Sequence, residues 1–299
     1  MIKFLPNASF ALGTSSLGHL TRPKAFSILN FAVENGLTDF DTAPLYGNSE
    51  GFLGDFSKRS GVKLNVTTKI GMPRPIVFSR NYVRETIYRS VELLSPNPIH
   101  TLFIHSIPLK SLSVDGLAEL FRLREQGLFS QLGFSGDNDE LRLASTSGHF
   151  DTFMISLNLI DLSNYSLFKN LSQSHFISIK RPIANAVWRQ QSKWKIQRHL
   201  WRLLGMGRGF EMESYPFRYE QWVKNFSQES PPQLEDFLKF LISIPINKRI
   251  VLGVSTLKHL KQITDFIAEL SIENVNPNYP EDIYQKWLRL NKYNWKALR

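Results

Sequence analysis

The sequence predicts an α/β fold of the (β/α)8 TIM-barrel class, in which eight parallel strands alternate with helices. Short runs rich in β-branched and aromatic residues alternate along the chain with amphipathic stretches, which is typical of repeated βα units. There are eight such runs, and no linker divides them, so one domain is expected over residues 1–299. The expected strands cover 11–15, 38–43, 64–70, 100–106, 130–135, 152–159, 176–182 and 249–255.

Helical patterns stand between the expected strands. The clearest cover 25–36, 81–94, 116–127 and 234–243, and the first and third end at Gly36 and Gly127, as helices often do. Residues 1–10 are left over and are expected to form a plug beneath the barrel.

Two further segments exceed what a barrel requires. Residues 183–230 are too long for an ordinary loop after the seventh strand and are expected to form an insertion over the barrel mouth. The tail from Asn274 predicts a last helix across one barrel end.

The composition limits the classes of function. Contents of 42% hydrophobic and 21% charged residues are typical of soluble globular proteins. No apolar run reaches the length of a membrane span or a signal peptide, so a cytoplasmic location without a membrane partner is expected. The absence of cysteine excludes disulfides, thiol nucleophiles and cysteine-bound metal.

The net charge of +10 is unevenly distributed. Between Lys180 and Lys224, ten lysines and arginines stand against three glutamates. One interpretation is nucleic-acid binding through this basic and aromatic segment. The favoured interpretation is a positive loop beside a site for an acidic substrate or for phosphate groups, because aromatic residues at these spacings more often pack against a core.

Polar residues mark the ends of three expected strands. Asp41 and Tyr46 follow the second strand, Lys69 ends the third and His105 ends the fourth. The carboxyl ends of barrel strands carry the active site, so these four side chains could converge there. The purely structural alternative is an Asp41–Lys69 ion pair that seals the mouth, beside a core histidine.

These four residue types also suit one reaction. The Lys69 ammonium would lower the pKa of a neighbouring tyrosine hydroxyl, and Asp41 would hold that lysine in place. His105 would then orient a substrate carbonyl while Tyr46 gives a proton to its oxygen. No side chain supplies a hydride, so the chemistry implies a nicotinamide cofactor.

The motifs around these residues resemble the aldo-keto reductase family over nearly the whole chain. They are FDTAPLYGNSEGFLG at 40–54, VTTKIG at 66–71, FIHS at 103–106, GFSGDN at 133–138 and LGVSTLKHL at 252–260. The resemblance implies a catalytic tetrad of Asp41, Tyr46, Lys69 and His105. It also implies NADP(H), with NAD(H) as an alternative, bound across the barrel mouth without a Rossmann motif.

The resemblance further implies the residues that contact the nicotinamide. Ser135 would hold its carboxamide, although the asparagine that commonly follows this serine is Gly136 here, and Asn158 matches a frequent asparagine nearby. The stacking aromatic of the family falls at Lys180 or Arg181. The planar guanidinium of Arg181 is expected to replace that ring, since adjacent residues on a strand face opposite sides.

The end of the eighth strand is the expected phosphate site. Gly253, Ser255, Thr256 and Lys258 precede or open a helix, whose free N–H groups suit a phosphate. Lys258 would face a 2′-phosphate, which favours NADPH. The alternative is an ordinary helix capped by Ser255 or Thr256.

The sequence thus predicts an NAD(P)H-dependent oxidoreductase that reduces an aldehyde or ketone to an alcohol. Its expected partner is a small carbonyl substrate of acidic or sugar-like character, with no nucleic acid and no metal, and the chain would be a monomer or small homo-oligomer. The alternative is a catalytically weak regulatory or redox-sensing subunit that binds the cofactor on the same fold.

Overall fold

The computed structural model describes residues 7–71, 78–105, 107–189, 215–226, 230–270 and 278–294. The chain forms two compact units. The barrel unit comprises residues 1–155, 166–180 and 246–270, and the second unit comprises residues 156–165, 181–245 and 271–299.

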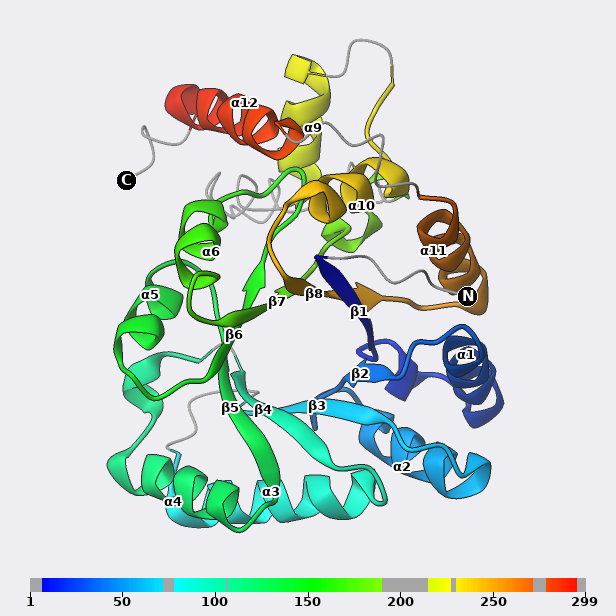
Figure 1. Ribbon diagram of the computed structural model, residues 1–299, viewed down its shortest axis with the longest axis vertical. Helices are drawn as coiled ribbons and strands as arrows, with labels where there is room; N and C mark the ends of the chain where they lie inside the picture. Colours follow the sequence, from blue (N-terminus) through cyan, green and yellow to red (C-terminus); the bar gives the residue numbers. More distant parts are fainter. Residues whose placement is uncertain are drawn as a thin grey trace, which may run out of the picture. The chain divides into compact units, whose positions relative to one another are not determined.

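Eight parallel strands close into a barrel in the order of the sequence, as the ring of arrows in Figure 1 shows. The strands are β1 (Ala8–Gly13), β2 (Asp39–Asp41), β3 (Asn65–Ile70), β4 (Ile99–His105), β5 (Phe129–Ser135), β6 (Thr152–Ser156), β7 (Phe176–Lys180) and β8 (Lys248–Gly253). This arrangement confirms the predicted (β/α)8 class. The prediction that residues 1–10 form a plug beneath the barrel is wrong for residues 8–10, which belong to β1. Residues 1–6 lie outside the described part of the chain.

Helices follow the strands around the outside of the barrel (Figure 1). They are η1 (Leu17–His19), α1 (Arg22–Glu34), α2 (Ser49–Ser60), α3 (Arg80–Leu94), η2 (Leu109–Ser111), α4 (Val114–Glu125), α5 (Asn138–Thr146), α6 (Tyr165–Leu171) and α11 (Leu257–Glu269). Gly36 and Gly127, just past the ends of α1 and α4, have φ angles of 85° and 79°. Glycine adopts this left-handed conformation at little cost, so both helices stop where the sequence predicts.

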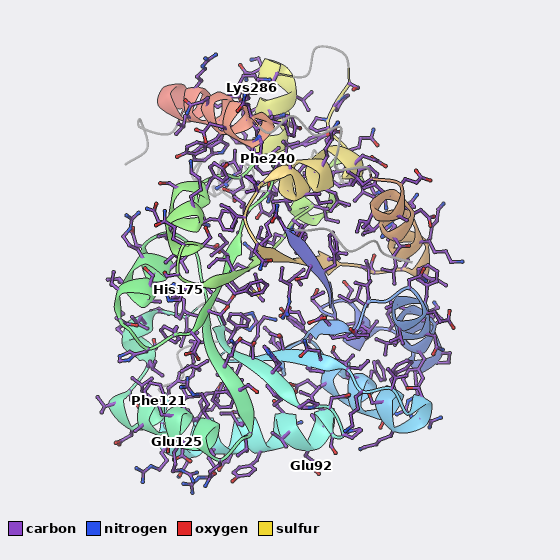
Figure 2. All side chains as sticks on the ribbon, viewed as in Figure 1. Glu92, Phe121, Glu125, His175, Phe240 and Lys286 are labelled. Atoms are coloured by element: carbon purple, nitrogen blue, oxygen red, sulfur yellow. The ribbon has the colours of Figure 1, made fainter. Side chains whose placement is uncertain are left out.

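The first and last strands meet along their whole lengths and close the ring. Their register runs from Ala8 opposite Lys248 to Gly13 opposite Gly253. Ala11 and Val251 of this seam join Phe103 and Met154 in one buried apolar cluster. Side chains fill the space between the strands and the surrounding helices, whereas charged residues such as Glu92 and Glu125 are exposed (Figure 2).

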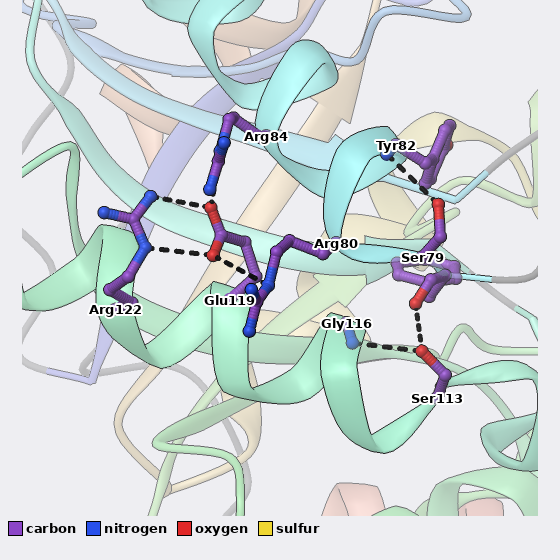
Figure 3. Close-up of polar contacts among 9 residues, drawn as sticks. Ser79, Arg80, Tyr82, Arg84, Ser113, Gly116, Glu119 and Arg122 are labelled. Carbon is purple, nitrogen blue, oxygen red and sulfur yellow. Dashed lines mark hydrogen bonds and ion pairs between the residues drawn. The ribbon is translucent and has the colours of Figure 1, made fainter.

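Helices α3 and α4 are joined by one buried carboxylate. Glu119 of α4 is almost fully buried, and Arg122 and Arg84 contact it at 2.6 and 2.9 Å, with Arg80 at 3.8 Å (Figure 3). The hydrogen bond from Arg122, reinforced by Arg84, lowers the pKa of Glu119 to about 2. This carboxylate therefore stays charged near neutral pH and ties the two helices together.

The second unit contains η3 (Ala184–Arg189), α9 (Tyr215–Phe226), α10 (Leu234–Ser243) and α12 (Tyr279–Asn294). Aromatic contacts hold it together: the rings of Trp188 and Phe237 lie 5.1 Å apart and those of Tyr165 and Tyr284 lie 4.8 Å apart. Helix α12 corresponds to the expected last helix. Of the expected insertion at 183–230, residues 190–214 and 227–229 lie outside the described part, including the expected Gly-rich turn.

Within the described ranges, no helix has both the length and the apolarity to cross a membrane. The same residues contain no group of three or more histidine, cysteine, aspartate or glutamate side chains arranged to hold a metal ion.

Lys248, the first residue of β8, is fully buried in the barrel unit. Its Nζ donates hydrogen bonds to the carbonyl oxygens of Asn7 and Ile246, at 3.1 and 3.0 Å. Burial lowers the pKa of Lys248 from 10.5 to about 7, because a buried ammonium loses its hydration. This lysine therefore makes stability depend on pH.

The free energy of unfolding is expected to rise with pH between about 7 and 10.5. In this window the folded protein has released the Lys248 proton while the unfolded chain still holds it, so the rise is on the order of 4 kcal/mol. Urea unfolding at several pH values measures it. Lys248→Met should flatten the rise, and Lys63→Met, at an exposed position, should not. Parallel pH profiles for the parent and Lys248→Met would contradict this expectation.

Candidate active site

The loop that carries Tyr46 is fixed by a chain of buried hydroxyl groups. Thr42 donates from Oγ1 to Ser49 Oγ at 2.9 Å, and Ser49 donates to Thr14 Oγ1 at 2.6 Å. Thr14 Oγ1 in turn donates to the carbonyl oxygen of Asp41 at 3.0 Å. These bonds join the start of the loop to its end and to the segment after β1, so Tyr46 is held from both sides.

The backbone of Gly18 packs directly against the same loop. Asn48 N donates to Gly18 O at 3.1 Å, and a Cβ atom at Gly18 would overlap the carbonyl oxygen of Tyr46. Gly47, next to the tyrosine, has a φ of 59°. The backbone around Tyr46 therefore depends on two positions where a side chain does not fit or is strained.

Lys69 and Asp41 form a buried ion pair at the carboxyl end of the barrel. Lys69 Nζ lies 2.6 Å from Asp41 Oδ2 and 2.8 Å from the Thr42 carbonyl oxygen, and the two side chains are 2% and 7% exposed. Burial alone would lower the pKa of Lys69, but the negative charge of Asp41 and its hydrogen bond to the lysine act against burial, and the pKa is raised. The lysine is therefore an ammonium at neutral pH.

Tyr46, Lys69 and His105 come together from three elements, as the sequence suggests. Lys69 Nζ lies 4.9 Å from the centre of the Tyr46 ring. The rings of Tyr46 and His105 are 6.1 Å apart and nearly perpendicular, and both residues are partly exposed. A phenol, an ammonium and an imidazole thus face one region at the strand ends, where they can act on a single polar group.

Glu50 is a buried residue that sequence reasoning did not single out. It lies in the first turn of α2 and accepts a hydrogen bond from Thr68 Oγ1 at 2.6 Å. Burial raises the pKa of its carboxyl group. Since Thr68 precedes Lys69, this contact fixes the strand that carries the lysine.

Ser135 lies at the end of β5, opposite His105 of β4 in the strand register. It is buried, and Lys180 Nζ at the end of β7 lies 3.4 Å from its Oγ. Asp137 Oδ2 lies 3.2 Å from the same ammonium. Lys180, rather than Arg181, therefore stands beside Ser135. The alternation of Ser178 and Lys180 with isoleucines is the sequence signal for this placement.

Asn158 and Arg181 belong to the second unit. The Asn158 side chain donates to Arg181 O at 3.1 Å and accepts from Ile160 N at 3.2 Å. Arg181 has a φ of 55°, and its Nη1 lies 3.4 Å from Ser156 Oγ. The strand alternation stops at Lys180 because β7 ends there, which sends Arg181 in another direction.

The loop after β8 opens helix α11. Thr256 Oγ1 caps this helix by accepting from His259 N at 3.2 Å, and Ser255 Oγ lies 3.4 Å from His259 Nδ1. Gly253, Ser255, Thr256 and Lys258 are all exposed, and a Cβ at Gly253 would meet no atom of the described residues within 4 Å. Thr256 thus serves as the cap that the sequence offered as an alternative, while no described residue fills the space beside Gly253.

Comparison with known proteins identifies the family. The model of the "Aldo/keto reductase family" matches residues 9–178. Among curated proteins, the aldo-keto reductase str7 of Strobilurus tenacellus is 31% identical over 116 residues, 37% of this chain and 34% of that protein. The uncharacterized oxidoreductase YqkF of Bacillus subtilis is 23% identical over 298 residues, 92% of this chain and 93% of its own length.

Solved structures share the fold. The holo form of aldo-keto reductase AKR11C1 from Bacillus halodurans has a TM-score of 0.73 at 18% identity, covering 96% of this chain and 95% of that one. An aldo/keto reductase from Klebsiella pneumoniae in complex with NADP and acetate has a TM-score of 0.62 at 17% identity, covering 93% and 90%. The family match spans more than half of the sequence and includes Asp41, Tyr46, Lys69 and His105, so the chain belongs to the aldo/keto reductase family.

Proposed function

We propose that this chain is an NADPH-dependent oxidoreductase that reduces an aldehyde or ketone to an alcohol. The observation that carries the proposal is that the Tyr46 ring lies beside both the buried Lys69 ammonium and the His105 ring. A proton donor and a hydrogen-bond donor in this arrangement suit a carbonyl oxygen that gains negative charge during reduction.

The residues present fit a nicotinamide dinucleotide. Asp41 Oδ1 is buried and has no hydrogen-bond partner among the described residues, so it can accept from a ribose hydroxyl. The space beside Gly253, which no described residue fills, and the first turn of α11 suit a phosphate group. When bound, the cofactor supplies the hydride, which no protein side chain can supply. The Klebsiella relative, which binds NADP, supports the same choice.

The chain's own residues would then perform three tasks. His105 donates a hydrogen bond that orients the substrate carbonyl. Tyr46 gives its hydroxyl proton to the carbonyl oxygen, leaving a phenolate. Lys69, held protonated by Asp41, stabilises that phenolate until a proton returns from solvent. The Lys69 ammonium, held in place by Asp41, is thus the positive charge next to the proton donor.

Loss of NADPH absorbance in the presence of a panel of aldehydes, ketones and sugars tests the function. Small carbonyl compounds of acidic or sugar-like character are the proposed substrates, since Lys69 and Lys180 both place ammonium groups at the strand ends. Tight NADPH binding without turnover of any carbonyl compound would favour the regulatory or redox-sensing alternative.

The parent protein is expected to bind NADPH more tightly than NADH. Lys258 lies in the first turn of α11, where its ammonium can form a charge-assisted bond with a 2′-phosphate. Lys258→Ala should reduce the ratio of the two affinities by about tenfold, and added salt should also reduce it. Fluorescence titration with both cofactors measures the ratio.

Lys261→Ala is the matched control, because Lys261 is also exposed on α11 but lies one turn further along, over the Phe31 ring. It should leave the ratio unchanged. Equal affinities of the parent for NADPH and NADH would contradict the proposal that Lys258 binds a 2′-phosphate.

A further inference from the structure

Lys180 is a charged residue at the barrel mouth that takes no part in the proposed proton transfer. Its side chain is 15% exposed, and its Nζ lies between Ser135 Oγ at 3.4 Å and Asp137 Oδ2 at 3.2 Å. Its charge also acts on Asp41, so the lysine lies within electrostatic reach of the tetrad. Ser135 itself is 1% exposed.

The chemistry of an ammonium fixes the direction of the bond to Ser135. An ammonium has three donors and no acceptor, so Lys180 donates and Ser135 Oγ accepts. The hydroxyl hydrogen of Ser135 must then point away from Lys180, toward an acceptor. Asp137, whose Oδ2 lies 3.2 Å from the ammonium, holds it in place.

Gly136, the residue after Ser135, offers no polar side chain for binding a ligand. A Cβ atom at Gly136 would overlap the ring of Phe134, and the Gly136 N–H already donates to Met154 O at 3.1 Å. An amide side chain at position 136 would therefore require Phe134 to move. The Ser135 hydroxyl therefore remains to bind a ligand. Because Lys180 donates to its oxygen, the hydroxyl acts toward that ligand as a hydrogen-bond donor.

We propose that Lys180 is a positioning residue that fixes the Ser135 hydroxyl as a hydrogen-bond donor to the carbonyl oxygen of the nicotinamide carboxamide. The inference rests on the proposed function, because it requires that a nicotinamide cofactor binds at the barrel mouth. It assigns to Lys180 a role in binding and orientation, with no proton transfer of its own.

A double-mutant cycle on cofactor binding tests the inference. Dissociation constants for NADP⁺ are measured by calorimetry for the parent, Ser135→Ala, Lys180→Met and the double variant. Lys180→Met should weaken binding about 3- to 10-fold, the usual range for one hydrogen bond. The double variant should bind no more weakly than Ser135→Ala alone, since Lys180 acts through Ser135.

Two further variants separate this role from a general effect of charge. Lys180→Arg keeps the donors and the charge and should bind within about twofold of the parent. Lys63→Met removes an exposed lysine elsewhere in the barrel unit and should leave the affinity unchanged. Equal thermal midpoints of these variants would show that the barrel stays folded.

A cofactor analogue supplies an independent readout. Thionicotinamide NADP⁺ replaces the carboxamide oxygen by sulfur, which is a weaker acceptor. The parent should bind it more weakly than NADP⁺, and Lys180→Met should narrow this difference because its Ser135 hydroxyl is free to turn. Unchanged binding in Lys180→Met, or an equal loss with and without Ser135, would overturn the inference alone. A parent that binds neither NADP⁺ nor NADPH would overturn the proposed function as well.

Discussion

Tyr46→Phe is expected to lower kcat by about 10²–10⁴-fold, the usual size of a general acid contribution. The change removes one hydroxyl group and keeps the ring that packs beside Lys69 and His105. The affinity for NADPH should change little, because the hydroxyl acts on the substrate oxygen. Steady-state kinetics together with NADPH titration separate the two effects.

Tyr88→Phe is the matched control for this experiment. Tyr88 is a half-exposed tyrosine on α3, outside the residues placed at the active site, so the same chemical change there should leave turnover unaltered. Turnover of Tyr46→Phe at the rate of the parent would remove Tyr46 from the mechanism.

Lys69→Met is expected to lower the free energy of unfolding by about 3–5 kcal/mol and to abolish turnover. The variant leaves the Asp41 carboxylate buried without its partner at 2.6 Å. The loss of stability should diminish toward acidic pH, because protonation of Asp41 removes its uncompensated charge. Urea denaturation measured over a range of pH reports it.

The double variant Lys69→Met/Asp41→Asn separates stability from catalysis. Removing both charges should recover part of the lost stability, since no ion is left unpaired in the interior. Turnover should stay low, because nothing then stabilises a Tyr46 phenolate. A single Lys69→Met variant as stable as the parent would contradict the buried ion pair.

Periodicity was sufficient to predict the barrel. Alternating residues mark the strands, and glycines such as Gly36 and Gly127 mark the helix ends, because both signals are local in the sequence. Asp41, Tyr46, Lys69 and His105 could be found for the same reason, since each stands at or just after a strand end. Their contacts follow from the parallel topology, which brings all the carboxyl ends to one side of the barrel.

Features that depend on distant parts of the chain could not be predicted in this way. The placement of Lys180 beside Ser135 depends on where β7 stops, and a shift of one residue exchanges it with Arg181. The burial of Lys248 depends on Asn7, 241 residues earlier in the chain. No local sequence pattern around Lys180 or Lys248 distinguishes it from an exposed lysine.

The pairing of β1 with β8 has a consequence for the synthesis of this protein on the ribosome. Strand β1 is made first, yet its partner at Lys248–Gly253 is made last among the strands. At usual rates of translation, one edge of β1 waits unpaired for on the order of 10–50 s. During that time it can pair wrongly with another chain, so completion of the ring should be the step at which molecular chaperones protect this protein most.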